Sequence, residues 1–249
     1  DLCSMLHAPS FMRILSGIQP TGTIHLGNYF GAVKNWVELQ SQYESIVMIV
    51  DLHALTIPQD PEKLRKNIFQ MAIDLLAAGV DPKRTIFFIQ SHVKEHAELA
   101  WILNTLTPMG ELERMTQYKD KSKRLREEAN AGLFTYPVLQ AADILLYQTD
   151  LVPVGKDQEQ HLEFARTIAR KFNHRFGDIF KEPEALIPKV GAKIMSVADP
   201  SKKMSKSLGP DHYIGLFENP DIIAKKIKTA VTDTGKEIKF EESKPGISN

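Results

Sequence analysis

This chain lacks the features that mark secreted, membrane-spanning or strongly charged proteins. Its single cysteine, Cys3, excludes a disulfide framework within the chain and suits a reducing compartment. No apolar run approaches the ~18 residues that a membrane helix needs, and residues 1–11 show no signal-peptide pattern. Basic and acidic residues both number 31, so no excess of one charge announces a nucleic-acid partner, although a local patch could still provide one.

The order of apolar segments indicates an α/β protein. The 249 residues are 43% hydrophobic and 25% charged, which is ordinary for a globular enzyme. Helical patterns separate the predicted strands, as in a doubly wound parallel sheet. One helix is predicted from an N-cap at Asp60 to Gly79, and another follows Gln158. The predicted strands are residues 14–18, 46–50, 86–89 and 151–154.

A polar run late in the chain is suited to binding phosphate. Residues 203–207 read Lys-Met-Ser-Lys-Ser and lie between Pro200 and Gly209, which indicates a loop. Its ammonium and hydroxyl groups can hold a polyphosphate and neutralise charge as a phosphoanhydride breaks. Taken alone, such a run is more often a solvated turn.

A glycine-rich turn near the start of the chain supports a phosphate-binding role for residues 203–207. Residues 17–28 read Gly-Ile-Gln-Pro-Thr-Gly-Thr-Ile-His-Leu-Gly-Asn, between a predicted strand and a helical pattern. Backbone N–H groups and the helix dipole favour anions at such a position. Neither segment fits G-x-G-x-x-G or G-x-x-x-x-G-K-[ST]. Polar residues also follow the other predicted strands, so we expect them to converge at one edge of the sheet.

The two segments resemble the two signatures of class I aminoacyl-tRNA synthetases, the HIGH element at residues 25–28 and the KMSKS element at 203–207. Residues 17–20, 111–117, 141–147 and 152–158 closely resemble tryptophanyl-tRNA synthetases of the bacterial and organellar type. This resemblance implies a Rossmann-like catalytic domain at residues 12–188. Residues 189–249 would hold the KMSKS loop and the start of a helical tRNA-binding region whose C-terminal part is missing. The leader, residues 1–11, has no assigned status.

The resemblance also assigns a tryptophan site. Asp143 lies in an apolar, helix-like run, where an isolated charge would be costly. By itself, Asp143 would be interpreted as part of a structural ion pair or as a helix cap. In the family, however, the matching aspartate accepts the indole N–H of tryptophan. Phenylalanine has no such donor and would leave the carboxylate unpaired. The predicted tryptophan-binding residues are Asp143, Tyr136, Gln158, His53, Gln140 and Gly17.

The ATP site implied by the resemblance draws on both signatures. Its predicted residues are Gln19, Pro20, Thr21, Gly27, Asn28, Gly155, Lys156, Asp157, Ile194, Lys203, Met204, Ser205, Lys206 and Ser207. The catalytic residues are expected to be Lys203, Lys206 and Lys121, which stabilise charge without covalent chemistry. His25 is not expected to be essential, since many members carry threonine there. Mg²⁺ is expected to arrive with ATP, with no metal ligand from the protein.

Some residues depart from the family or suggest other chemistry. Leu15 replaces a usual phenylalanine, Gln140 a commoner methionine and Lys156 a usual glutamate. His92 and His96 fit the zinc pattern H-x-x-E-H, but His92 is expected to precede the helix, so we interpret this short match as accidental.

We therefore predict ATP-dependent activation of L-tryptophan and its transfer to tRNA(Trp) by a homodimer. The expected location is the cytoplasm, with mitochondria as the alternative. One rival is a tyrosyl-tRNA synthetase, for which Gln140 is also a known choice. Another is a synthetase-derived, non-catalytic module that binds RNA or signals.

Overall fold

Five parallel strands form the central sheet. The computed structural model describes residues 12–116, 129–155, 158–187 and 194–232. The strands run in the order β3-β2-β1-β4-β5, which confirms the predicted doubly wound, Rossmann-like α/β fold. Their bounds are β1 (Arg13–Ile18), β2 (Glu44–Ile49), β3 (Thr85–Ile89), β4 (Leu151–Pro153) and β5 (Glu184–Leu186).

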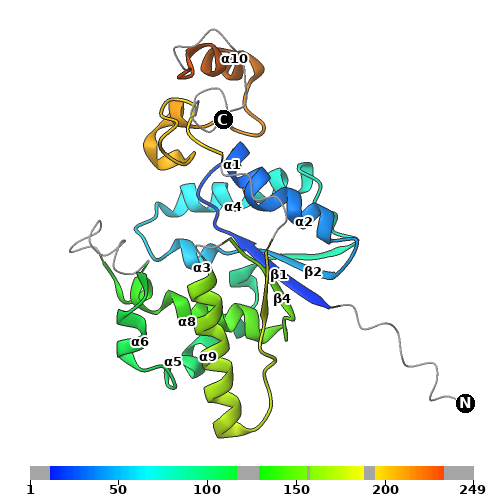
Figure 1. Ribbon diagram of the computed structural model, residues 1–249, viewed down its shortest axis with the longest axis vertical. Helices are drawn as coiled ribbons and strands as arrows, with labels where there is room; N and C mark the ends of the chain where they lie inside the picture. The colour runs from blue at the N-terminus through cyan, green and yellow to red at the C-terminus, as the bar shows by residue number, and fades with distance from the viewer. Residues whose placement is uncertain (1–11, 117–128, 156–157, 188–193, 233–249) are drawn as a thin grey trace, which may run out of the picture.

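Helices cover both faces of the sheet. Figure 1 shows α2 and α4 on one face and α8 and α9 on the other. No helix in the described ranges is long and apolar enough to cross a membrane. The α-helices are α1 (Leu26–Asn28), α2 (Lys34–Leu39), α3 (Asp51–Ala54), α4 (Pro61–Ala77), α5 (Glu95–Asn104), α6 (Met109–Glu113), α8 (Ala131–Leu146), α9 (Glu159–Phe176) and α10 (Pro220–Thr229). A π-helical turn (Tyr29–Val33) joins α1 to α2, and short 3₁₀ turns span Gln90–His92, Lys206–Leu208 and Pro210–His212.

The central strand β2 divides its side chains between two apolar clusters. Ile46 and Met48 pack with α5, α8 and α9, whereas Val47 and Ile49 pack with α2 and α4. Successive side chains of a strand point to opposite faces, so a strand buried on both faces reads as a continuous apolar run. This explains why β2 was visible in the sequence.

Local signals also place the helices that flank the site. Asp60 caps α4, its carboxylate accepting the backbone N–H of Lys63 at 2.7 Å, and Pro61 occupies the first turn. The helix ends before Gly79, whose φ of +109° suits glycine. Gln158 stands at the N-terminus of α9, as predicted.

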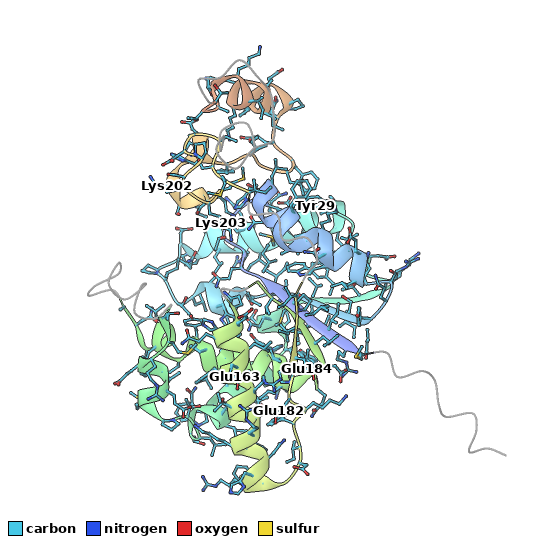
Figure 2. The ribbon with its side chains drawn as sticks, viewed as in Figure 1. Tyr29, Glu163, Glu182, Glu184, Lys202 and Lys203 are labelled. Carbon is cyan, nitrogen blue, oxygen red and sulfur yellow. The ribbon has the colours of Figure 1, made fainter. Side chains whose placement is uncertain are left out.

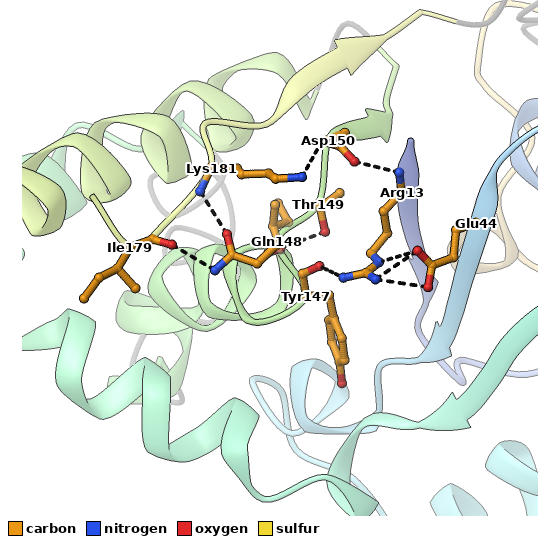
Figure 3. Close-up of polar contacts among 9 residues, drawn as sticks. Arg13, Glu44, Tyr147, Gln148, Thr149, Asp150, Ile179 and Lys181 are labelled. Atoms are coloured by element: carbon orange, nitrogen blue, oxygen red, sulfur yellow. Dashed lines mark hydrogen bonds and ion pairs between the residues drawn. The ribbon is translucent and has the colours of Figure 1, made fainter. Parts of the chain in front are cut away.

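The edge of the sheet where the strands begin is joined by polar contacts (Figure 3). Arg13 at the start of β1 makes a two-pronged ion pair with Glu44 of β2 and donates to the Tyr147 carbonyl. Its backbone N–H donates to Asp150 at 2.7 Å, and Lys181 contacts the same carboxylate at 3.0 Å. Three strands are therefore held together at the edge opposite their carboxyl ends.

Candidate functional site

A cavity of about 370 Å³ opens where the strands end, at the position expected for ligands of such a sheet. Its apolar wall includes Leu15, Met48, Val50 and Ile144, which suits a flat hydrophobic group. All six predicted tryptophan-binding residues line it: Gly17, His53, Tyr136, Gln140, Asp143 and Gln158. The fold thus brings together side chains from β1, α3, α8 and the start of α9.

The carboxylate of Asp143 lies in this wall with three side-chain partners. Asp143 lies on α8 and is 1% exposed. Oδ1 lies 2.7 Å from Gln90 Nε2 and 2.6 Å from His96 Nδ1, and Oδ2 lies 2.7 Å from His53 Nε2. Since each carboxylate oxygen can accept about two hydrogen bonds, Oδ2 keeps one acceptor position.

These partners fix the charge of Asp143. Burial raises the pKa of its carboxyl, but the hydrogen bonds and charges of His53 and His96 outweigh burial and hold the pKa below its ordinary value. An ionised carboxylate only accepts, so both imidazoles donate N–H to it. The other ring nitrogen of His96, Nε2, lies 2.8 Å from the Tyr147 hydroxyl oxygen. Burial, with the charges of Asp143 and Glu95, raises the Tyr147 pKa to about 12.

The cavity wall also carries a second buried pair. The hydroxyl of Tyr136 lies 2.7 Å from His161 Nε2, and both residues are buried. Burial raises the pKa of Tyr136, so its hydroxyl stays protonated and keeps oxygen lone pairs for a cation. Gln158 lies nearby along α9 and lines the same cavity.

The predicted ATP residues of the first segment form a close turn after β1. Gln19 and Gly155 line the cavity, and the Thr21 N–H donates to the Gln19 carbonyl at 2.8 Å. Gly27 belongs to α1, where a Cβ would come within 3.0 Å of the His25 ring and 3.5 Å of Met204. Lys121, Lys156 and Asp157 lie outside the described residues.

His25 acts as the N-cap of α1. Its Nδ1 accepts from the Asn28 backbone N–H at 3.2 Å, while the Asn28 side chain accepts from the His25 N–H at 3.3 Å. Burial, followed by the positive charges of Lys206 and Lys203, lowers the His25 pKa to about 4. The ring is therefore neutral at physiological pH, as its acceptor role at the cap requires.

The KMSKS segment lies against this first turn. Met204 is 3% exposed and its N–H donates to the Ile194 carbonyl, which brings the predicted adenine contact beside the segment. Ser205 caps the following 3₁₀ turn through the Ser207 N–H. Lys206 Nζ donates to the Thr23 carbonyl at 2.9 Å. Lys203 is exposed, and Figure 2 shows it on the α1 side of the molecule, far from Glu163 and Glu182.

Sequence reasoning missed three of these groups. Gln90 and His96 support Asp143, and His161 supports Tyr136. The pattern H-x-x-E-H drew attention to His96 for the wrong chemistry: His92 ends a 3₁₀ turn before α5 begins, and His96 points to Asp143. Within the described ranges, no group of three or more His, Cys, Asp or Glu side chains could hold a metal ion.

The chain is similar to tryptophan–tRNA ligases over almost its whole length. The family model for class I tRNA synthetases (W and Y) matches residues 8–249. The tryptophan–tRNA ligase of Helicobacter pylori is 56% identical over 238 residues, which are 95% of this chain and 73% of that protein.

Solved structures agree with this similarity. Tryptophanyl-tRNA synthetase of Campylobacter jejuni, complexed with ADP and tryptophan, is 46% identical with a TM-score of 0.83, covering 90% of this chain and 69% of that one. Tyrosyl-tRNA synthetase of Archaeoglobus fulgidus, complexed with L-tyrosine, is 25% identical with a TM-score of 0.71, covering 92% and 68%. The chain therefore belongs to the class I tRNA synthetases for tryptophan and tyrosine, and within them to the tryptophanyl-tRNA synthetases.

Proposed function

We propose that the cavity binds L-tryptophan with its indole N–H donated to Asp143. The observation that carries this proposal is the buried carboxylate that keeps one acceptor position on Oδ2 while the side chains of His53, Gln90 and His96 occupy the others. Indole has one donor and no acceptor. The apolar wall of the cavity suits the rest of the ring, and Tyr136 with Gln158 would receive the α-ammonium group.

The polar network around Asp143 would select tryptophan over phenylalanine and tyrosine. Phenylalanine would bury the Asp143 carboxylate without satisfying its last acceptor position, and sites built around a substrate donor reject analogues that lack it. Tyrosine could donate its O–H to Oδ2, but its hydroxyl oxygen would then need a donor of its own. The side chains of Gln90 and His96 already donate to Oδ1, which favours tryptophan over tyrosine.

The reaction joins tryptophan to AMP and then to tRNA(Trp). The tryptophan carboxylate attacks the α-phosphorus of ATP, the bond to the bridging oxygen breaks, and pyrophosphate leaves. A ribose hydroxyl of tRNA then attacks the adenylate carbonyl and releases AMP. Lys203, Lys206 and Lys121 would stabilise charge on the phosphates, so catalysis is positioning and electrostatics.

We also propose the remaining partners. Mg²⁺ would be held by triphosphate oxygens and water, as is common for this ion in nucleotide sites. The homodimer expected from the family resemblance is supported by an apolar groove of about 500 Å³ beside α4, lined by Leu55, Leu64, Ile68 and Phe69. The enzyme would work in the cytoplasm, or in mitochondria if it serves an organelle.

Pyrophosphate exchange with each of the twenty amino acids tests this function. Tryptophan alone should drive exchange in the unaltered chain. Asp143→Asn keeps the shape but replaces the charge, so kcat/KM for tryptophan should fall at least about tenfold, the effect of losing a hydrogen bond to a charged group. Asp150→Asn is the matched control, because it removes a carboxylate at the opposite edge of the sheet and should leave exchange unchanged.

Other outcomes would favour the rivals. Exchange driven by tyrosine would contradict the tryptophan assignment and support a tyrosyl enzyme. An intact fold, shown by a cooperative thermal transition, without exchange for any amino acid would support the non-catalytic module.

A further inference from the structure

Asp74 is a buried carboxylate that the proposed reaction does not use. It lies on α4 at 2% exposure, within the apolar cluster that contains Ile24, Met71 and Leu75. Oδ1 accepts from Gln70 Nε2 at 2.8 Å, and Oδ2 accepts from the Ile24 backbone N–H at a long 3.4 Å. Both donors are neutral, and burying a carboxylate on neutral donors alone is costly.

A cation lies on the other side of the same turn. Lys206 Nζ donates to the carbonyl of Thr23, the residue before Ile24, and a Cβ at Gly22 would lie 3.8 Å from that nitrogen. Asp74 and Lys206 therefore contact consecutive residues of the turn between β1 and α1. Burial lowers the Lys206 pKa, and the negative charge of Asp74 opposes this effect.

We propose that Asp74 is a positioning residue that holds Lys206 against the turn formed by residues 22–24 until a triphosphate competes for the ammonium group. This inference rests on the proposed role of Lys206 at the ATP phosphates. Among the residues that the structure describes, the half-buried ammonium has its hydrogen bond to the Thr23 carbonyl at the turn, so the carboxylate behind that turn supplies the opposite charge that retains it. Binding of ATP would then transfer Lys206 from a fixed carboxylate to the phosphate oxygens.

Neutralising Asp74 should favour that transfer. Asp74→Asn keeps the shape and an oxygen for the Ile24 N–H, and the Gln70 amide can turn to face the new NH₂. We expect KM for ATP in tryptophan-dependent exchange to fall about two- to tenfold, the size of one partly exposed charge pair, with little change in kcat. The shift should shrink in a Lys206→Met background, since the two residues act through one contact.

Chemical modification tests whether Lys206 is held against the turn in the absence of ATP, independently of catalysis. Limited acetylation followed by mass spectrometry gives the ratio of modification at Lys206 to that at the exposed Lys203. In Asp74→Asn this ratio should rise, because Lys206 is both less retained and more often neutral. Asp74→Leu is a second neutral variant that suits the apolar surroundings, and Asp150→Asn removes the same charge elsewhere and should leave the ratio unchanged.

The two readouts separate this inference from the proposed function. If the unaltered chain exchanges pyrophosphate with tryptophan but neither neutral variant changes the ratio or KM for ATP, the role of Asp74 is wrong. If the ratio of Lys206 to Lys203 acetylation rises in Asp74→Asn while the unaltered chain activates no amino acid, the role of Asp74 toward Lys206 is supported and the proposed function is wrong. A higher KM for ATP in Asp74→Asn would contradict the direction of the inference.

Discussion

At the scale of single residues, the site is built from side chains whose protonation state is set by their neighbours. His25 is an example, because the N-cap contact with Asn28 needs an unprotonated Nδ1 while two lysines and burial disfavour the imidazolium. A histidine beside a phosphate site invites a general-acid role, but a ring with a pKa near 4 is not an imidazolium at neutral pH and lacks the acidic proton that a general acid donates. The cap therefore accounts for His25 without assigning it chemistry.

This pKa predicts how stability depends on pH. The ordinary histidine pKa of 6.5 applies to the unfolded chain and a value of about 4 to the folded chain. Between these values the unfolded chain binds a proton that the folded chain does not, so the contribution of His25 to stability falls as pH falls through that window. His25→Thr keeps a capping oxygen and does not titrate.

Urea unfolding at steps from pH 7 to pH 4 measures the effect. The free energy of unfolding should fall less steeply in His25→Thr than in the unaltered chain. Equal slopes in the two proteins would show that His25 does not titrate with the expected pKa.

The sequence predicted single residues well where a motif or an apolar context marked them. Asp143 was visible because a carboxylate in an apolar run needs partners. The roles of Gln90 and His96 at Asp143 were not, since their partner lies 53 and 47 residues away along the chain. Whether the predicted residues contact ligands stays a prediction, but their convergence on one cavity follows from strand order.

At the scale of elements, residues 214–216, which follow the KMSKS segment, are joined to the first turn by backbone hydrogen bonds. Leu26 N–H donates to the Ile214 carbonyl at 3.0 Å, and Leu216 N–H donates to the Ile24 carbonyl at 2.8 Å. The chain is thus anchored a few residues after the segment, while Lys206 of the segment contacts the Thr23 carbonyl of the first turn. An anchored base with projecting lysines suits groups that follow the charge of a reacting phosphate.

This arrangement predicts a kinetic separation for the two lysines. Lys203→Ala and Lys206→Ala should each lower kcat for adenylate formation far more than they raise KM for tryptophan, because the lysines would act on charge that develops in the transition state. Lys202→Ala provides a control, since Lys202 pairs with Asp199 outside the KMSKS residues. Exchange rates that stay unchanged in both variants would reduce the segment to an ordinary surface turn.

Elements whose sequences lack a strong apolar pattern were not predicted. The strand β5 contains only Glu184, Ala185 and Leu186, and it forms because β4 offers an edge in parallel register. The predicted strands therefore did not include residues 184–186. The π-helical turn at residues 29–33 was not predicted either, and such turns are rare in proteins.

At the scale of the whole molecule, the groove beside α4 exposes large apolar side chains. The apolar groove beside α4 carries Phe69, which is 72% exposed, and Leu55, which is 55% exposed. Large exposed apolar groups that gather in one groove are typical of an interface. A second copy of the chain is the partner that we propose for this surface.

A charge placed in the groove should disrupt the dimer. Phe69→Arg would bury an unpaired charge at the interface, so sedimentation velocity should show monomer at concentrations where the unaltered chain is dimeric. Ile179→Arg is the matched control, because Ile179 is 51% exposed in the loop after α9. A dimer that survives Phe69→Arg would place the interface elsewhere.

The network around Asp143 also constrains the order of folding. Its partners come from α3, from the turn after β3 and from α5, between 47 and 90 residues away along the chain. Long loops must close before any of these contacts form, and until then the carboxylate is cheaper in water than in the core. Helix α8 therefore cannot dock with its charge buried before the first half of the sheet is complete, so the substrate-selecting pocket forms late, on an already assembled scaffold.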